Sequence, residues 1–92
     1  MEKIEVVSNG KTQVIDVDGL FYGLGLKPNT ETFKNMVEMD SEGYILQFEN
    51  TATSIPGIFS AGDVSDKHYR QAVVAAAEGC KAAMDVVSYL DT

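Results

Sequence analysis

The most regular pattern in the sequence is a run of apolar residues at helical spacing, from about Tyr69 to Leu90. Apolar residues recur every three or four positions, which predicts a long amphipathic helix. The opposite face carries the polar residues Gln71, Glu78, Lys81, Asp85 and Ser88. The apolar stripe consists of Val73, Ala76, Cys80, Ala83, Met84, Val87 and Leu90. Its small residues and nearby Gly79 allow a close neighbour, so we expect this helix to pack tightly on a sheet. Ser65 or Asp66 is its expected N-terminal cap.

A hairpin signal stands near the start of the chain. Asn9-Gly10 separates two β-prone runs, residues 4–7 and 12–17. A type I′ turn needs positive φ at both central positions, which Asn and Gly tolerate better than other residues. The sequence therefore predicts an antiparallel hairpin at the N-terminal end.

Short apolar and polar stretches alternate between the hairpin and the helix. Leu20 to Gly25 is apolar almost throughout, as a strand buried on both faces would be, and Pro28 ends it. The other expected elements are a brief helix at 31–36, a turn at 40–43, and short strands at 44–48 and 58–61. We therefore expect an α/β fold with an N-terminal β-hairpin, short strands and a long C-terminal helix.

Composition and charge exclude several classes of protein. The chain is 45% hydrophobic and 23% charged, which is typical of a folded globular protein. It carries 14 acidic and 7 basic side chains, a net charge of -7. Phosphate backbones and anionic lipids would repel it, so we expect neither nucleic acid nor a membrane surface as a partner. The start of the chain shows no signal-peptide pattern and no window is apolar enough for a membrane span, so a cytoplasmic location is expected.

Few residues offer independent catalytic or metal chemistry. Cys80 is the only cysteine, which excludes an intrachain disulfide, a CxxC pair and a cysteine-rich zinc site; we expect it to be a small buried hydrophobe. His68 is the only histidine and is expected to be a solvated loop residue. No His-Asp pair is available to activate a serine hydroxyl. We therefore predict no catalytic residue and no metal site.

The segment that best suggests a ligand-binding site runs from the expected strand at 58–61 through Gly62-Asp63 to the long helix. In open α/β sheets, ligands bind beyond the carboxyl ends of strands, where the following helix points its free N–H groups. Gly62 would admit a ligand closely, and Asp63 would accept hydrogen bonds from ligand hydroxyls. The N–H groups near Arg70, Gln71 and Ala72 could receive an electron-rich oxygen. Because Gly-Asp is also an ordinary turn pair, the residues alone leave both interpretations open.

Several of these motifs resemble one family of flavoproteins. The stretch from Thr53 to Val64, the run Tyr69-Arg70-Gln71-Ala72 and residues 76–83 resemble the C-terminal FAD-binding segment of bacterial-type thioredoxin reductases. Residues 17–25 and 27–30 look like the connection from the NADPH domain back to the FAD domain. Tyr69-Arg70-Gln71-Ala72 favours this family over related pyridine nucleotide-disulfide dehydrogenases that share the Gly-Asp motif.

The resemblance implies a partial FAD/NAD(P)-binding Rossmann-like domain. Residues 1–17 would be the end of the NADPH domain, and residues 18–92 the C-terminal part of the FAD-binding domain. FAD would be the cofactor, with Asp63 bonded to its ribityl chain and Gly62 admitting it. The implied cofactor-binding residues are Gly62, Asp63, Val64, Tyr69, Arg70, Gln71 and Ala72. In the intact enzyme, electrons would pass from NADPH to FAD, then to a CxxC disulfide and on to thioredoxin.

The sequence departs from this family in three places. It has no GxGxxG motif for the ADP half of FAD, no CxxC dithiol and no NADPH-binding glycine motif. Its 92 residues also cannot hold two nucleotide-binding domains of about 100 to 150 residues each. We therefore expect the chain alone to be inactive. It would be either a fragment of a longer reductase or a non-catalytic module that completes a partner chain, and its apolar 20–24 strand would favour self-association.

Overall fold

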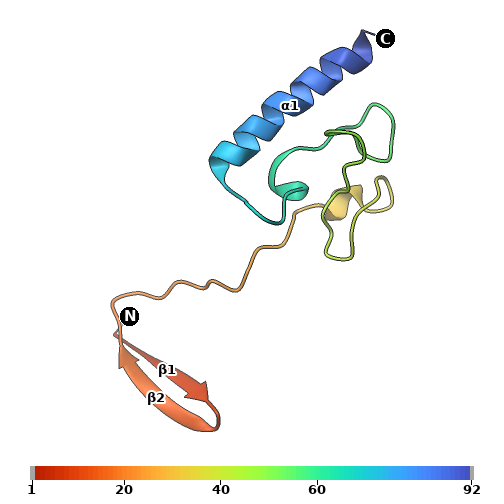
Figure 1. Ribbon diagram of the computed structural model, residues 1–92. Helices are drawn as coiled ribbons and strands as arrows, with labels where there is room; N and C mark the ends of the chain where they lie inside the picture. Colours follow the sequence, from red (N-terminus) through yellow and green to blue (C-terminus); the bar gives the residue numbers. More distant parts are fainter. Residues whose placement is uncertain (1, 92) are drawn as a thin grey trace.

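The computed structural model describes residues 2–91, so Met1 and Thr92, the outer ends of the two expected domains, lie outside the described residues. Two separate parts are joined by an extended segment (Figure 1). The first part is a hairpin of strands β1 (Lys3–Ser8) and β2 (Lys11–Asp16). The second consists of loops, two 3₁₀ turns, η1 (Glu31–Phe33) and η2 (Gly62–Val64), and the helix α1 (Ala72–Leu90).

The hairpin confirms the turn prediction. The strands pair antiparallel from Lys3 opposite Asp16 to Ser8 opposite Lys11. Asn9 and Gly10 connect them with φ values of 53° and 76°, the positive angles that a type I′ turn requires. Within residues 2–91 the two strands contact each other and no other helix or strand.

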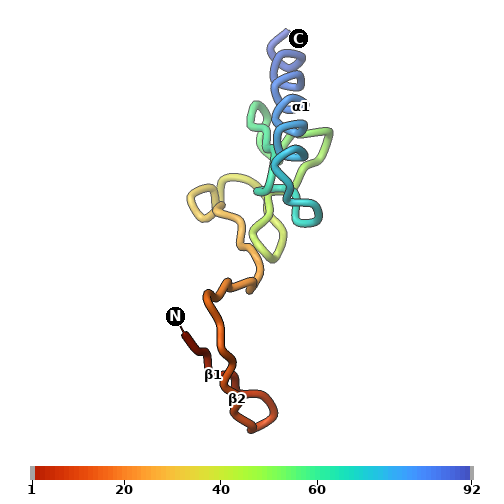
Figure 2. Tube along the Cα trace, turned by 90° about the vertical axis from the view of Figure 1, so that its left-hand side faces the viewer, coloured from red at the N-terminus to blue at the C-terminus, as the bar shows by residue number. Residues whose placement is uncertain are grey.

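The prediction of a buried strand at Leu20 to Gly25 is wrong. This stretch is an extended connection without strand pairing, visible as the long thin segment between the two parts in both views (Figures 1 and 2). Phe21 is 98% exposed, and Tyr22, Leu24 and Leu26 are exposed as well. A strand needs a neighbouring strand to satisfy its backbone groups, and none lies beside this segment among the described residues.

The loop region between η1 and α1 contains a small core. Val37, Tyr44 and Ile45 are its buried apolar residues. The expected turn at 40–43 is confirmed: Asp40 accepts hydrogen bonds from the backbone N–H groups of Glu42 and Tyr44 at 2.9 and 3.0 Å. The expected strands are reduced to single bridges, Met39 with Ile45 and Ala52 with Phe59, and the brief helix to the single turn of η1.

Helix α1 forms over most of the predicted range, but the prediction that it packs on a sheet is wrong. It lies against the loops, with Ala75 beside Gly62 and the Tyr89 ring at 5.9 Å from the Phe59 ring. The apolar stripe faces outward: Val73 is 75% exposed, and Met84, Val87, Leu90 and Cys80 are also exposed. Cys80 is thus not the buried residue that was expected. The loops contribute polar partners to the opposite face of α1, and nothing among residues 2–91 covers the stripe.

The whole chain is far more open than a compact protein of its length. Its radius of gyration is 19.6 Å, against about 12 Å for a compact chain of the same number of residues. Its accessible surface is 7444 Å², against roughly 5,200 Å² for a compact monomer of the same mass. Within the described part of the chain, no helix combines the length and apolar character that crossing a membrane requires. The architecture is a partial α/β unit with much apolar surface exposed.

Candidate functional site

The Gly62–Asp63 turn sits where the loop region meets the start of α1. Gly62 is buried and has a φ of +84°, a conformation that side chains rarely adopt. A Cβ atom at this position would lie 3.5 Å from Cβ of Ala75, the fourth residue of α1. Glycine is therefore favoured by the backbone angle, whereas the contact with Ala75 alone would tolerate a Cβ atom.

Hydrogen bonds fix this turn on both sides of Gly62. The Gly62 N–H donates to Oε2 of Glu78 at 2.8 Å. The Gly62 carbonyl accepts the N–H groups of Ser65 and Asp66 at 3.0 and 2.9 Å. Val64, the last residue of η2, accepts the Ile45 N–H at 2.8 Å and so connects the turn to the small core.

Asp63 is the exposed residue of this rigid turn. No donor among residues 2–91 forms a hydrogen bond with its carboxylate. A carboxylate without an internal partner can accept two or more hydrogen bonds from an external donor such as a hydroxyl group. The turn thus presents one free anionic acceptor on a fixed backbone.

Asp66 shapes the loop between the turn and α1. Its carboxylate accepts the backbone N–H groups of His68, Tyr69 and Arg70 at 3.0, 2.9 and 3.0 Å. The N–H groups of Tyr69 and Arg70, followed by that of His68 and its charge, hold the pKa of Asp66 below its ordinary value. Asp66 therefore organises the loop as an anion; it does not cap α1 as expected.

Arg70 and Gln71 set where the helix begins. Arg70 has a φ of +51°, which no helical residue adopts, so the expected helix start at Tyr69 is wrong and α1 begins at Ala72. Gln71 is the N-cap residue in extended conformation and makes no side-chain capping bond. In the described structure, the N–H groups of the first turn of α1 have no side-chain acceptor. They remain available to an external electron-rich group.

The predicted site residues therefore fall into three places. Gly62, Asp63 and Val64 form η2, Tyr69 to Gln71 form the loop, and Ala72 starts α1. Gly62 lies against α1. The Tyr69 side chain, by contrast, is exposed to solvent. His68 is exposed, as expected. Among residues 2–91, no three His, Cys, Asp or Glu residues are grouped closely enough to hold a metal ion.

The sequence did not indicate the contact that supports Arg70. Its guanidinium carbon lies 5.2 Å from the centre of the Tyr44 ring, within cation–π range. Nor did it indicate Glu78, which was expected on the polar face of the helix. Asp66 was named only as a candidate cap of the helix. Its role in the loop could have been recognised, since Asp side chains commonly accept hydrogen bonds from backbone N–H groups a few residues later in turns.

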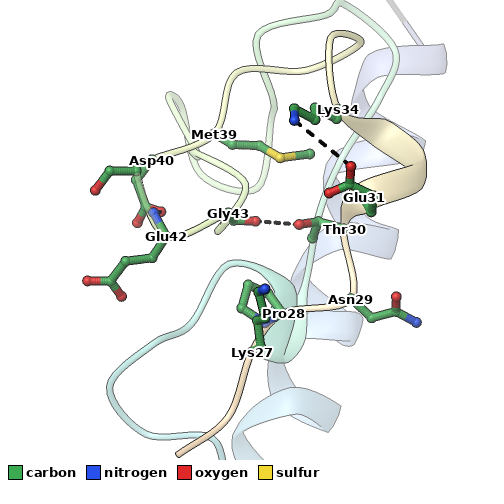
Figure 3. A pocket seen from close by; sticks show the side chains of 11 residues that line it. Lys27, Pro28, Asn29, Thr30, Glu31, Lys34, Met39, Asp40, Glu42 and Gly43 are labelled. Atoms are coloured by element: carbon green, nitrogen blue, oxygen red, sulfur yellow. Dashed lines mark hydrogen bonds and ion pairs between the residues drawn. The ribbon is translucent and has the colours of Figure 1, made fainter.

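A hollow of about 770 Å³ lies elsewhere, between residues 27–34 and 39–43 (Figure 3). The Thr30 hydroxyl donates to the Gly43 carbonyl across it, and Lys67 pairs with Asp40 at 3.5 Å. Its charged lining mixes two lysines, Lys27 and Lys34, with Glu31, Asp40 and Glu42. Opposite charges of similar number give no field of one sign, so the hollow does not indicate a charged ligand.

Comparisons with known proteins give a consistent result. Residues 1–79 match the family described as pyridine nucleotide-disulphide oxidoreductase. A thioredoxin reductase of Coxiella burnetii is 52% identical over 91 residues, which cover 94% of this chain and 28% of the relative. A thioredoxin reductase structure from Giardia duodenalis superposes with a TM-score of 0.79 at 40% identity, covering 98% of this chain and 30% of its own. The T. acidophilum thioredoxin reductase gives 0.84 at 33% identity, covering 99% and 31%.

This chain thus spans less than a third of the length of each of these relatives. The covered fractions do not say which part of each relative this chain matches. Its expected C-terminal position in such an enzyme therefore stays a prediction. The neighbours support a partial FAD/NAD-binding fold for the chain.

Proposed function

This chain belongs to the pyridine nucleotide-disulphide oxidoreductase family, and from that premise we propose that it is a flavin-holding segment of a thioredoxin reductase. Residues 18–92 are assigned to the FAD-binding domain and residues 1–17 to the end of the NADPH domain. The lack of contact between the hairpin and the other elements of residues 2–91 supports this division. The cytoplasmic location stays a prediction.

The observation that carries the proposal is the free carboxylate of Asp63 on a turn fixed at Gly62. The ribityl chain of FAD is a row of hydroxyl donors, and an exposed carboxylate without an internal partner suits it chemically. Gly62 supplies the positive φ of this turn and leaves it without a side chain where it lies beside α1. Asp63 is therefore assigned as the acceptor for ribityl hydroxyls.

The start of α1 supports a second part of the same site. Its first-turn N–H groups have no side-chain acceptor within the described residues, and the positive end of the helix dipole lies there. Ala72 and the loop residues Tyr69, Arg70 and Gln71 would face the electron-rich edge of the flavin ring. When bound, FAD supplies the redox chemistry, and these residues bind it and favour negative charge on its ring.

The intact reaction needs residues that this sequence does not contain. No GxGxxG and no CxxC occurs in the 92 residues, so the ADP half of FAD and the redox disulfide must be provided by other polypeptide. The exposed stripe of α1 and the excess of accessible surface support such a partner, either the remainder of the reductase or a complementing chain. NADPH as donor and thioredoxin as acceptor belong to that intact enzyme.

The test is a measurement of FAD affinity, with quenching of flavin fluorescence as the readout of binding. We expect Asp63→Ala to weaken binding about tenfold, the usual effect of losing a hydrogen bond to a charged group. Asp18→Ala, which removes another exposed carboxylate, is the control and should bind normally. Equal affinity of the Asp63→Ala chain and the wild type would sink the assignment. Binding only after mixing with a chain that carries GxGxxG would identify this chain as a complementing piece.

A further inference from the structure

Glu78 reaches out of α1 to the backbone of the turn. Its Oε2 atom accepts the Gly62 N–H at 2.8 Å, although the two residues are 16 positions apart. Glu78 is partly buried, whereas the amphipathic pattern placed it on the solvent face. Its carboxylate thus has a specific partner at the candidate site.

The Gly62 N–H has no other means of being satisfied. Gly62 is the first residue of η2, and Ala61 before it provides no side-chain cap. A buried N–H without an acceptor is unfavourable, so such groups are nearly always paired. Glu78 provides the acceptor from outside the turn, and it carries a charge, which strengthens the bond.

This bond also constrains Asp63. The Gly62 carbonyl is held by Ser65 and Asp66, and the Gly62 N–H by Glu78, so the peptide groups on both sides of Gly62 are fixed. Asp63 follows directly, and the direction of its Cα–Cβ bond depends on the orientation of the peptide before it. Loss of the Glu78 contact would free the Gly62 backbone, whose glycine has many accessible conformations.

We propose that Glu78 is a positioning residue that holds the Gly62–Asp63 turn, and through it the Asp63 carboxylate, in the orientation that receives the ligand. The identity of that ligand as FAD rests on the proposed function. The hydrogen bond and the order that it imposes on Asp63 do not depend on the ligand and can be measured without it.

The first measurement is amide hydrogen exchange of the 92-residue chain, read by NMR at Gly62 and Asp63. Glu78→Ala should make the Gly62 N–H exchange at least about tenfold faster and shift the Asp63 amide signal. Glu78→Gln keeps a side-chain oxygen acceptor and should restore much of the protection. Glu49→Ala removes an exposed glutamate whose carboxylate has no hydrogen bond within residues 2–91, and should change neither signal. Unchanged Gly62 exchange in Glu78→Ala overturns the proposal; if that variant loses its helical circular dichroism, Glu78→Gln decides with the Asp63 shift.

The second measurement is a double-mutant cycle on FAD affinity. Glu78→Ala should weaken FAD binding about tenfold when Asp63 is present and cause no further loss in an Asp63→Ala background. A merely structural effect would reduce affinity equally in both backgrounds, and that result would overturn the positioning role. If the wild-type chain binds FAD neither alone nor after mixing with a chain that carries GxGxxG, the proposed function fails, and the exchange measurement still decides whether Glu78 holds the turn.

Discussion

Oδ2 of Asp85 accepts two hydrogen bonds from Thr51, one from its backbone N–H at 3.1 Å and one from its hydroxyl, across 34 positions of sequence. Thr51 is only 2% exposed, so its N–H and hydroxyl groups depend on this partner. The Thr51 hydroxyl, followed by its N–H, holds the pKa of Asp85 below its ordinary value of 3.8. The helix is thus tied to the loops by a carboxylate whose ionised form is favoured by these two hydrogen bonds.

The first prediction concerns acid. Asp85 and Asp66 both have pKa values below the ordinary 3.8, so the stability they add is present above that pH and is lost as pH falls through their folded pKa values. The urea concentration at the midpoint of unfolding, monitored by helical circular dichroism, should decrease as the pH is lowered from about 4 to about 2. Asp66→Asn cannot titrate and should lose part of this dependence. An unchanged midpoint in the wild type would contradict the prediction.

The second prediction compares two glycines. Gly62→Ala should lower the free energy of unfolding by about 1–2 kcal/mol, because alanine disfavours the positive φ of this position. Gly79→Ala should raise it by about 0.5–1 kcal/mol, because Gly79 lies inside α1 with open space where a Cβ would stand. Thermal unfolding of the two variants checks the opposite signs. A stabilised Gly62→Ala chain would show that the strained turn does not form.

The third prediction concerns the small core. Tyr44 is 3% exposed and lies under the Arg70 guanidinium. Tyr44→Ala should lower the free energy of unfolding by about 3 kcal/mol through the cavity it leaves. Tyr44→Phe keeps the ring and its cation–π contact and should cost about 1 kcal/mol or less. Urea unfolding measures both, and similar losses for the two variants would show that the ring does not fill the core.

The fourth prediction concerns the exposed stripe of α1. The wild-type chain should self-associate at high concentration, because Val73, Met84 and Val87 leave apolar surface uncovered. Val87→Lys should shift the chain toward monomer without loss of helix, as sedimentation and circular dichroism would show. Ser41→Lys adds the same charge in a distant exposed turn and is the control. A wild-type chain that sediments as a clean monomer would count against the stripe as an association surface.

Local signals were sufficient where the interactions are local. Asn9-Gly10 identified the hairpin because its turn depends on the φ preferences of two adjacent residues. The Asp40 turn and the existence of α1 also follow from neighbours within a few positions. The Leu20–Gly25 strand failed because its partner would have to come from distant chain, and the described chain supplies none.

The candidate site shows the same limit. The motif located Gly62, Asp63 and the loop before α1, yet it gave the wrong cap and the wrong helix start. Asp66 bonds its own loop and Arg70 adopts a positive φ, and neither is encoded by helical periodicity.

The sequence by itself determined the hairpin, the presence of a long helix and the Gly-Asp motif, because each rests on the preferences of adjacent residues. Only the tertiary structure decided which face of α1 packs against the loops of this chain. Glu78 and Asp85 turn toward the loops because buried N–H and hydroxyl groups there need acceptors, and the apolar stripe is left outward. Such pairings join residues far apart in the chain, so no local pattern could reveal them.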